Sequence, residues 1–392
     1  MLRLIILIFL AFVSVGCFDR QDVTFKNGNV MLAGTLTLPS GDMAHPAIIF
    51  VHGSGAASRE TNRFYADLFA RHGIATLIYD KRGVGASTGD WRYVHLSDLA
   101  DDALAGVQLL KSRKDINPNQ IGIFGGSQGG WVAPLVASRS KNVAFVITSA
   151  GSTFTPTHLA KWRSITYVRN AGYSDEIVQR AAALMDLQFD LIRREGWMKG
   201  WEKYEVELQK VRNESWYPLL SELRNPRKDS WFMSYTASID FDPIPVYENL
   251  NVPVLAILGE ADVLVPARET AAMLERIKKE KNKDITIAIL SGADHNMNRP
   301  TGARPVPEYA ETMIGWILRK VNVSNQAAHN NSMDVRARTA TFLSRISCSL
   351  NLRGFGFAQC HLSRSPFLYS IDFQFKLIID SRNFYALIGE IL

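Results

Sequence analysis

Hydrophobic residues occur along this chain in short continuous runs, separated by longer segments with helical spacing. The runs predict strands buried on both faces, at residues 47–52, 75–79, 121–124, 145–149, 253–259 and 285–290. Apolar positions three and four apart predict amphipathic helices at residues 64–72, 96–112, 131–138, 267–280 and 307–321. This alternation predicts the α/β class, with a mostly parallel sheet flanked by helices.

The N-terminal part of the pattern differs, because apolar and polar residues alternate there. Residues 23–26 and 31–38 follow this alternation on the two sides of Asn27-Gly28-Asn29. Such a sequence is typical of a β-hairpin. We expect an edge strand on each side of its turn.

The αβ alternation stops over residues 152–250, which show helical spacing but no strand-like run. We interpret this segment as a helical lid inserted before the strand at 253–259, dividing the core into residues 17–151 and 251–322. The insertion holds five of the chain's eight tryptophans: Trp162, Trp197, Trp201, Trp216 and Trp231. They predict a pocket with apolar and aromatic walls, although the same residues could instead form the insertion's own core.

Residues 323–392 form a C-terminal extension in which no regular period is sustained, so its order stays uncertain. The extension carries two of the three cysteines, Cys348 and Cys360. Three cysteines exclude a disulfide framework. These two are either paired, in an oxidising compartment, or free thiols.

The first residues have the composition of a targeting segment. Arg3 precedes an apolar stretch at residues 4–15, too short to span a bilayer comfortably. We interpret residues 1–16 as a signal peptide, and the sequence before Cys17 resembles a bacterial lipobox, in which Cys17 is lipidated. Ordinary secretory cleavage, with Cys17 as a bystander, is the alternative. We expect export to the bacterial cell envelope with a lipid anchor to a membrane, facing the periplasm or the exterior.

Charge and histidine spacing exclude other classes of partner. The net charge is +6, and the extension after Asn322 supplies half of it, with seven basic and four acidic residues. The basic residues form no stripe and no nucleic-acid-binding module is recognisable, so no nucleic-acid partner is predicted. No pair of histidines has the spacing of metal ligands, and neither a metal nor a cofactor is implied.

The strongest candidate chemistry lies at Gly125-Gly-Ser-Gln-Gly129, between the run at 121–124 and the helical pattern at 131–138. This is the G-x-S-x-G nucleophile elbow in its strand–turn–helix setting, with Ser127 as the nucleophile. Glycines are needed there because the turn is strained and neighbouring side chains would collide with the strand and the helix. The alternative is a flexible Gly/Ser turn.

Two later strands end in loops that carry an acid and a histidine. Asp262 follows one strand and His295 the next, and active residues of parallel sheets lie at the carboxyl ends of strands. A serine hydroxyl needs a base, which predicts that His295 takes its proton and that Asp262 orients His295. Glu260, on the same loop as Asp262, is the competing acid.

The oxyanion formed during acyl transfer needs preorganised N–H donors. We predict these donors to be the backbone amides of Gln128, at the start of a helix, and of Ser54, in the loop after the first buried strand. His52 is expected to be a structural buried histidine, and Asp80 and Arg82 are expected to organise their loop.

These motifs together resemble the α/β-hydrolase superfamily over about residues 22–321, closest to its serine aminopeptidase-like and dienelactone-hydrolase-like branches. The order nucleophile, acid, histidine is the order of that fold. The matching pieces are His52-Gly-Ser-Gly55, Asp80-Lys-Arg-Gly-Val-Gly85, Gly125-Gly-Ser-Gln-Gly-Gly130, Gly259-Glu-Ala-Asp262 with Val265-Pro266, and Gly292-Ala-Asp-His295.

The resemblance implies a serine hydrolase of carboxylesterase type that cleaves ester bonds of a small-molecule acyl substrate through a covalent acyl-enzyme. A serine aminopeptidase-type peptidase or a thioesterase is the alternative, because the same fold supports all three. A non-catalytic binding protein on this scaffold is a further hypothesis. The acids Glu202, Glu205 and Glu207 are the candidates that a peptidase would use to bind a free amine.

Overall fold

The computed structural model describes residues 18–92, 94–220, 238–299 and 305–320, together with two short strands at 346–351 and 357–362. The chain divides into two compact units, residues 1–322 and 323–392. The expected signal peptide and Cys17 lie outside the described residues. In the part of the chain that is described, no helix has both the length and the apolar character needed to cross a membrane.

The first unit is built on one eight-stranded sheet with the strand order β1-β2-β4-β3-β5-β6-β7-β8. From β4 onward all neighbours are parallel, whereas β1 pairs antiparallel with β2 and β2 antiparallel with β4. The predicted fold class is therefore confirmed. The strands are β1 (Phe18–Asn27), β2 (Val30–Pro39), β3 (His45–Val51), β4 (Ala75–Tyr79), β5 (Ile116–Gly126), β6 (Phe145–Ser149), β7 (Val254–Gly259) and β8 (Ile285–Leu290).

The N-terminal hairpin forms around Gly28, whose φ of 54° is the left-handed conformation that such a turn requires. Its second strand is not an edge strand, and that expectation was wrong: β2 also pairs with β4, and Leu32 and Leu36 on it are fully buried. The alternation of β2 is consistent with an interior position because small residues fill its other positions.

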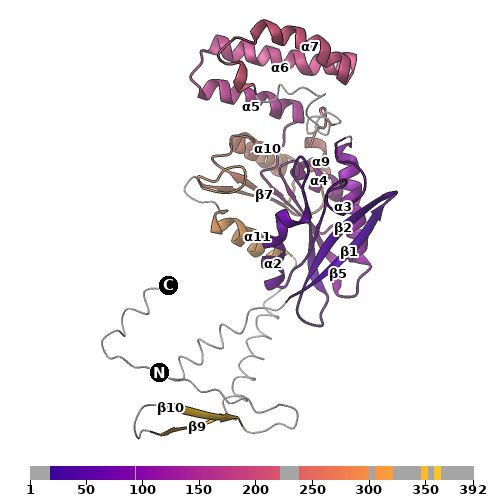
Figure 1. The fold of residues 1–392 in the computed structure, drawn as a ribbon, viewed down its shortest axis with the longest axis vertical. Helices are drawn as coiled ribbons and strands as arrows, with labels where there is room; N and C mark the ends of the chain where they lie inside the picture. The colour runs from indigo at the N-terminus through magenta and orange to yellow at the C-terminus, as the bar shows by residue number, and fades with distance from the viewer. Residues whose placement is uncertain are drawn as a thin grey trace, which may run out of the picture. The chain divides into compact units, whose positions relative to one another are not determined.

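Helices cover both faces of the sheet (Figure 1). They are α2 (Arg63–Arg71), α3 (Leu96–Lys111), α4 (Gly129–Arg139), α10 (Ala267–Glu280) and α11 (Pro307–Lys320). Successive residues of a strand point to opposite faces. Ile49 of β3 accordingly joins the core formed with α3, α4 and α10, while the Phe50 ring lies 5.7 Å from that of Phe69 on α2.

Between β6 and β7 the chain forms helices α5 (Pro156–Asn170), α6 (Asp175–Glu195), α7 (Trp197–Val211) and the short α9 (Ile244–Asn249). The helix α6 packs against both α5 and α7 (Figure 1). Trp216 packs with residues of α5 and α6, and Trp201 stacks edge-on with Tyr204, so both tryptophans belong to cores within this helical segment. For these two tryptophans, the alternative interpretation holds: they form the insertion's own core.

The second unit contributes strands β9 (Ile346–Asn351) and β10 (Phe357–Leu362), which pair antiparallel. Their register places Cys348 directly opposite Cys360 on the backbone. The rest of the predicted extension lies outside the described residues.

Candidate active site

Ser127 lies at the tip of a sharp turn between β5 and α4, with a φ of 53°. A non-glycine residue in this conformation is strained and is held there by its surroundings. The glycines of the turn permit the close packing. A Cβ atom at Gly125 would overlap the carbonyl oxygen of Gly129, and one at Gly130 would overlap the backbone of Gly151. The turn therefore has the geometry expected of a nucleophile elbow.

A continuous chain of hydrogen bonds connects Ser127 to His295 and Asp262. His295 Nδ1 lies 2.8 Å from Asp262 Oδ2, and His295 Nε2 lies 2.9 Å from Ser127 Oγ. A carboxylate can only accept, so Nδ1 carries the proton and Nε2 accepts from the serine hydroxyl. The sequence separations are 168 and 33 residues, so only the fold brings these groups together.

Asp262 is fixed on both of its oxygens. Its Oδ1 accepts from the backbone N–H groups of Leu264 and Val265, at 2.7 and 3.0 Å, and its Oδ2 faces His295. The side chain is only 1% exposed. This arrangement leaves the carboxylate one orientation, in which it selects the histidine tautomer.

Glu260, the competing acid, points elsewhere. It accepts from the Ser291 hydroxyl and the Gly292 N–H, and these bonds hold its pKa below the usual value. Asp294, next to His295 in sequence, caps a turn by accepting from the N–H groups of Asn296 and Asn298. The geometry thus joins Asp262, and neither of the other two acids, to His295.

A small pocket opens at Ser127 and His295 and is also lined by Ser54 and Gln128. Within the described residues, the backbone N–H groups of Ser54 and Gln128 donate to no other group. Gln128 also stands at the N-terminus of α4, where the helix dipole favours negative charge. Both predicted donors are therefore at the pocket and available to an oxyanion.

The remaining pocket walls come from α4, the acid loop and α5, in which the sequence marked few individual pocket residues. Trp131 of α4 and Leu264 and Val265 of the acid loop supply apolar surface, and Leu159 and Arg163 reach the pocket from α5. Apart from Val265, which belongs to a quoted motif, these residues lie in ordinary helical and loop patterns, so no signal in the sequence marked them as pocket residues. Among the described residues, the tryptophan that lines this pocket is Trp131 of the core, whereas Trp231 and the side chain of Trp197 lie outside the described part of the chain.

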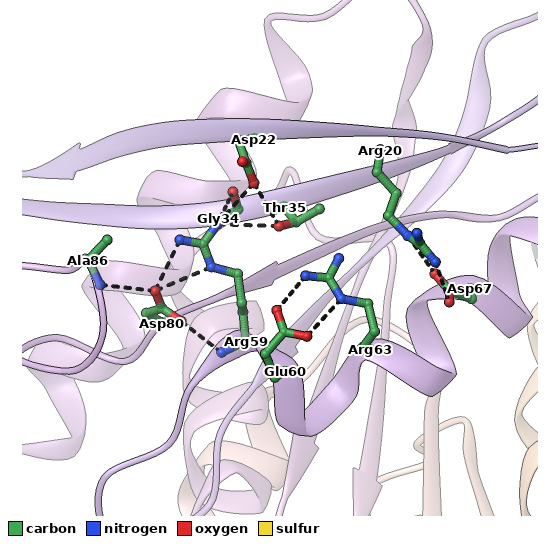
Figure 2. Close-up of polar contacts among 10 residues, drawn as sticks. All are labelled: Arg20, Asp22, Gly34, Thr35, Arg59, Glu60, Arg63, Asp67, Asp80 and Ala86. Atoms are coloured by element: carbon green, nitrogen blue, oxygen red, sulfur yellow. Dashed lines mark hydrogen bonds and ion pairs between the residues drawn. The ribbon is translucent and has the colours of Figure 1, made fainter.

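The loop after β4 is held by buried ion pairs, as expected for Asp80 and Arg82. Asp80 accepts from the backbone and side chain of Arg59 and from the N–H of Ala86 (Figure 2). Arg82 makes a two-point contact with Asp102 of α3, both bonds being 2.7 Å. These contacts determine the course of the loop that carries Lys81.

His52 has the structural role expected of it. It is 4% exposed, and its Nε2 contacts the carbonyl oxygen of Tyr79. Burial lowers the pKa of His52 to about 4. Among the described residues, no three histidine, cysteine or acidic side chains are grouped as a metal site would require.

Comparison with known proteins shows which family this chain resembles. A profile of the alpha/beta hydrolase family matches residues 48–312. Esterase EstD of Thermotoga maritima is 23% identical over 306 residues, which are 76% of this chain and 65% of EstD. The chain thus spans less than two thirds of that relative's length.

Solved structures share the fold. The alpha/beta hydrolase GrgF from Penicillium sp. sh18 superposes with a TM-score of 0.51 at 19% identity, covering 77% of this chain and 99% of GrgF. The esterase Pf2001 of Pyrococcus furiosus also gives 0.51, at 18% identity, covering 77% of this chain and 91% of that protein. Since the family profile spans most of the chain, and the elbow, strand order and loop positions agree with it, this chain belongs to the alpha/beta hydrolase family.

Proposed function

We propose that the protein is a serine hydrolase of carboxylesterase type, with Ser127, His295 and Asp262 as its catalytic triad. The observation that carries the proposal is the hydrogen-bonded sequence from Asp262 through His295 to Ser127, at 2.8 and 2.9 Å. It ends in a pocket where two backbone amides have no other acceptor. The relative EstD, named an esterase, supports ester substrates.

The proposed reaction proceeds in two halves. Ser127 Oγ attacks the ester carbonyl while His295 Nε2 takes its proton, and the resulting oxyanion is bound by the N–H groups of Ser54 and Gln128. The C–O bond to the alcohol then breaks, and His295 returns the proton to the departing alkoxide. A water molecule, deprotonated by His295, attacks the acyl-enzyme, and the carboxylic acid leaves as Ser127 is restored.

The pocket lining favours an ester over a substrate with a free amine. Among the described residues that line it, none is an aspartate or glutamate that could bind the ammonium group of such a substrate. The three lid acids considered for amine binding lie on α7, and none of them lines this pocket. The apolar surface of Trp131, Leu159 and Leu264 suits the hydrocarbon part of an acyl group.

A panel of substrates tests this proposal. We expect the wild type to hydrolyse p-nitrophenyl esters faster than acyl thioesters or aminoacyl-anilides, and Ser127→Ala to lose at least about 10⁴-fold in kcat. Ser138→Ala is the matched control, because its hydroxyl donates to Leu135 within α4, away from the pocket. Full activity in Ser127→Ala would refute the mechanism. Cleavage of anilides alone would favour the peptidase.

We also propose that the protein is exported and held at a membrane through a lipid on Cys17. The support is the signal-like sequence before Cys17, and cleavage before Cys17 would leave every strand that the structure describes intact. Metabolic labelling with a radioactive fatty acid should mark the wild type and not Cys17→Ser. Unlabelled wild-type protein released from membranes would favour ordinary secretory cleavage.

A further inference from the structure

Lys81 is a buried lysine immediately behind the candidate active site, and the proposed mechanism gives it no role. It is 3% exposed and lies on the loop that follows β4. Its Nζ donates to the carbonyl oxygens of Gly53 and Gly55, at 2.8 and 3.1 Å, and to Oε1 of Gln128, at 3.1 Å. All three donor sites of the ammonium are thereby used.

The contact with Gly53 acts directly on a proposed oxyanion donor. The carbonyl of Gly53 and the N–H of Ser54 belong to one planar peptide group, and no cis peptide bond is found in the described chain. In a trans peptide these two groups point in opposite directions. An ammonium bound to the oxygen therefore fixes the direction of the N–H and increases its polarity. Ser54 itself lines the pocket.

The same ammonium reaches the second proposed donor. Gln128 supplies the other backbone amide of the candidate oxyanion hole, and its side chain accepts from Lys81 Nζ. The two donors come from segments separated in sequence, the loop after β3 and the start of α4. Lys81 therefore connects the two segments whose separation determines where an oxyanion can bind.

No carboxylate neutralises this ammonium by direct contact within the described residues. The nearby Asp102 is already bound at both oxygens by Arg82. Burial lowers the pKa of Lys81 to about 7, and Asp102 opposes that shift. Placing a cation here is costly for the fold. The loop that carries Lys81 is held by the bonds of Asp80 to Arg59 and Ala86 (Figure 2), and the centroid of the Trp91 ring lies 5.8 Å from Lys81 Nζ.

We propose that Lys81 is a positioning residue of the oxyanion hole. Lys81 holds and polarises the Ser54 backbone amide and keeps it correctly placed relative to the Gln128 backbone amide. The inference rests on the proposed serine-hydrolase function. Because an oxyanion exists only during the reaction, Lys81 should affect kcat and leave the binding of the ester ground state nearly unchanged.

The test replaces Lys81 by Met, which fills similar space but donates no hydrogen bond. We expect Lys81→Met to lower kcat for a p-nitrophenyl ester by roughly 10- to 100-fold, somewhat less than deletion of a complete oxyanion-hole donor, with KM changed by less than about twofold. Lys320→Met is the control, since Lys320 Nζ also lies 5.8 Å over a tryptophan ring, that of Trp316, but outside the pocket. It should retain full activity.

A second readout is the rate at which a fluorophosphonate modifies Ser127. In that reaction the Ser127 oxygen bonds to phosphorus, fluoride leaves, His295 takes the proton, and the phosphoryl oxygen occupies the oxyanion hole. Labelling should slow in Lys81→Met by the same factor as kcat. Should that variant fail to fold, Lys81→Gln, which keeps an amide donor without the charge, tests the polarising effect alone: it should also slow labelling, and labelling at the wild-type rate would overturn that effect.

The outcomes separate the two proposals. Wild-type protein in which Ser127 resists labelling would overturn the serine-hydrolase function, and with it the role of Lys81. Wild type and Lys81→Met labelled at equal rates would overturn the role of Lys81 alone. A rise in KM with unchanged kcat would also overturn it, because that result would indicate a role in ground-state binding.

Discussion

Asp262 uses its two oxygens for different partners, and this division makes Asp262→Asn a sharp test of the triad. Oδ1 accepts from two backbone N–H groups, so the oxygen of an asparagine amide must take that place. The NH₂ group then faces His295 Nδ1 and donates to it. His295 is thereby forced into the tautomer that carries its proton on Nε2, directed at Ser127, and it can no longer act as the base.

The expected loss of kcat is about 10⁴-fold, equivalent to about 5 kcal/mol of transition-state stabilisation, the size known for this change in other serine hydrolases. KM should change little, since the side chain of Asp262 is 1% exposed and Asp262 does not line the pocket. Asparagine has nearly the same shape as aspartate, so the fold should persist. Steady-state hydrolysis of a p-nitrophenyl ester, with thermal unfolding beside it, measures both quantities.

Glu260→Gln on the same loop is the matched control. Its carboxylate bonds to Ser291 and Gly292 and not to His295, so kcat should stay within about twofold of the wild type. If Asp262→Asn retained more than a tenth of wild-type activity, the tautomer argument would be refuted. If Glu260→Gln alone lost activity, the acid would be Glu260.

Three further predictions concern stability, measured as the free energy of unfolding in urea. Burial lowers the pKa of His52 to about 4 from its usual value near 6.5, so below pH 6.5 the unfolded chain binds a proton that the folded protein excludes. The free energy of unfolding should therefore fall by up to about 3 kcal/mol between pH 6.5 and 4. His52→Asn should lose this dependence on pH. An equal dependence in both proteins would contradict the argument. Gly125→Ala should lower the free energy of unfolding by about 1–3 kcal/mol or more, because the added Cβ atom would overlap backbone atoms. Gly126→Ala should cost much less, because the nearest neighbour of its Cβ atom would be 3.6 Å away. Equal costs would count against steric crowding. Asp102→Asn should cost about 3–5 kcal/mol by leaving a buried guanidinium without its counter-charge. Asp90→Asn, in an exposed pair, should cost less than about 1 kcal/mol, and equal losses would show that burial of the pair does not matter.

The local pattern of apolar and polar residues was sufficient to predict most of the core. The apolar runs marked the central strands because a strand buried on both faces must be apolar throughout, and the elbow was visible because its glycines are required by steric crowding next to Ser127. The interior position of β2 was missed. Its alternating sequence is equally compatible with an edge strand, and only its pairing with β4 decides between them.

Taken by itself, the sequence determined the fold class, the elbow at Ser127, and the two strand-end loops that carry Asp262 and His295. These features depend on residues close together in the chain, where spacing and residue type limit the conformation directly. The tertiary structure alone decided that Arg163 reaches the pocket from α5 and that Lys81 lies behind Ser54 and Gln128. Such contacts join segments distant in sequence, and they follow from strand order and side-chain direction, which no local pattern records.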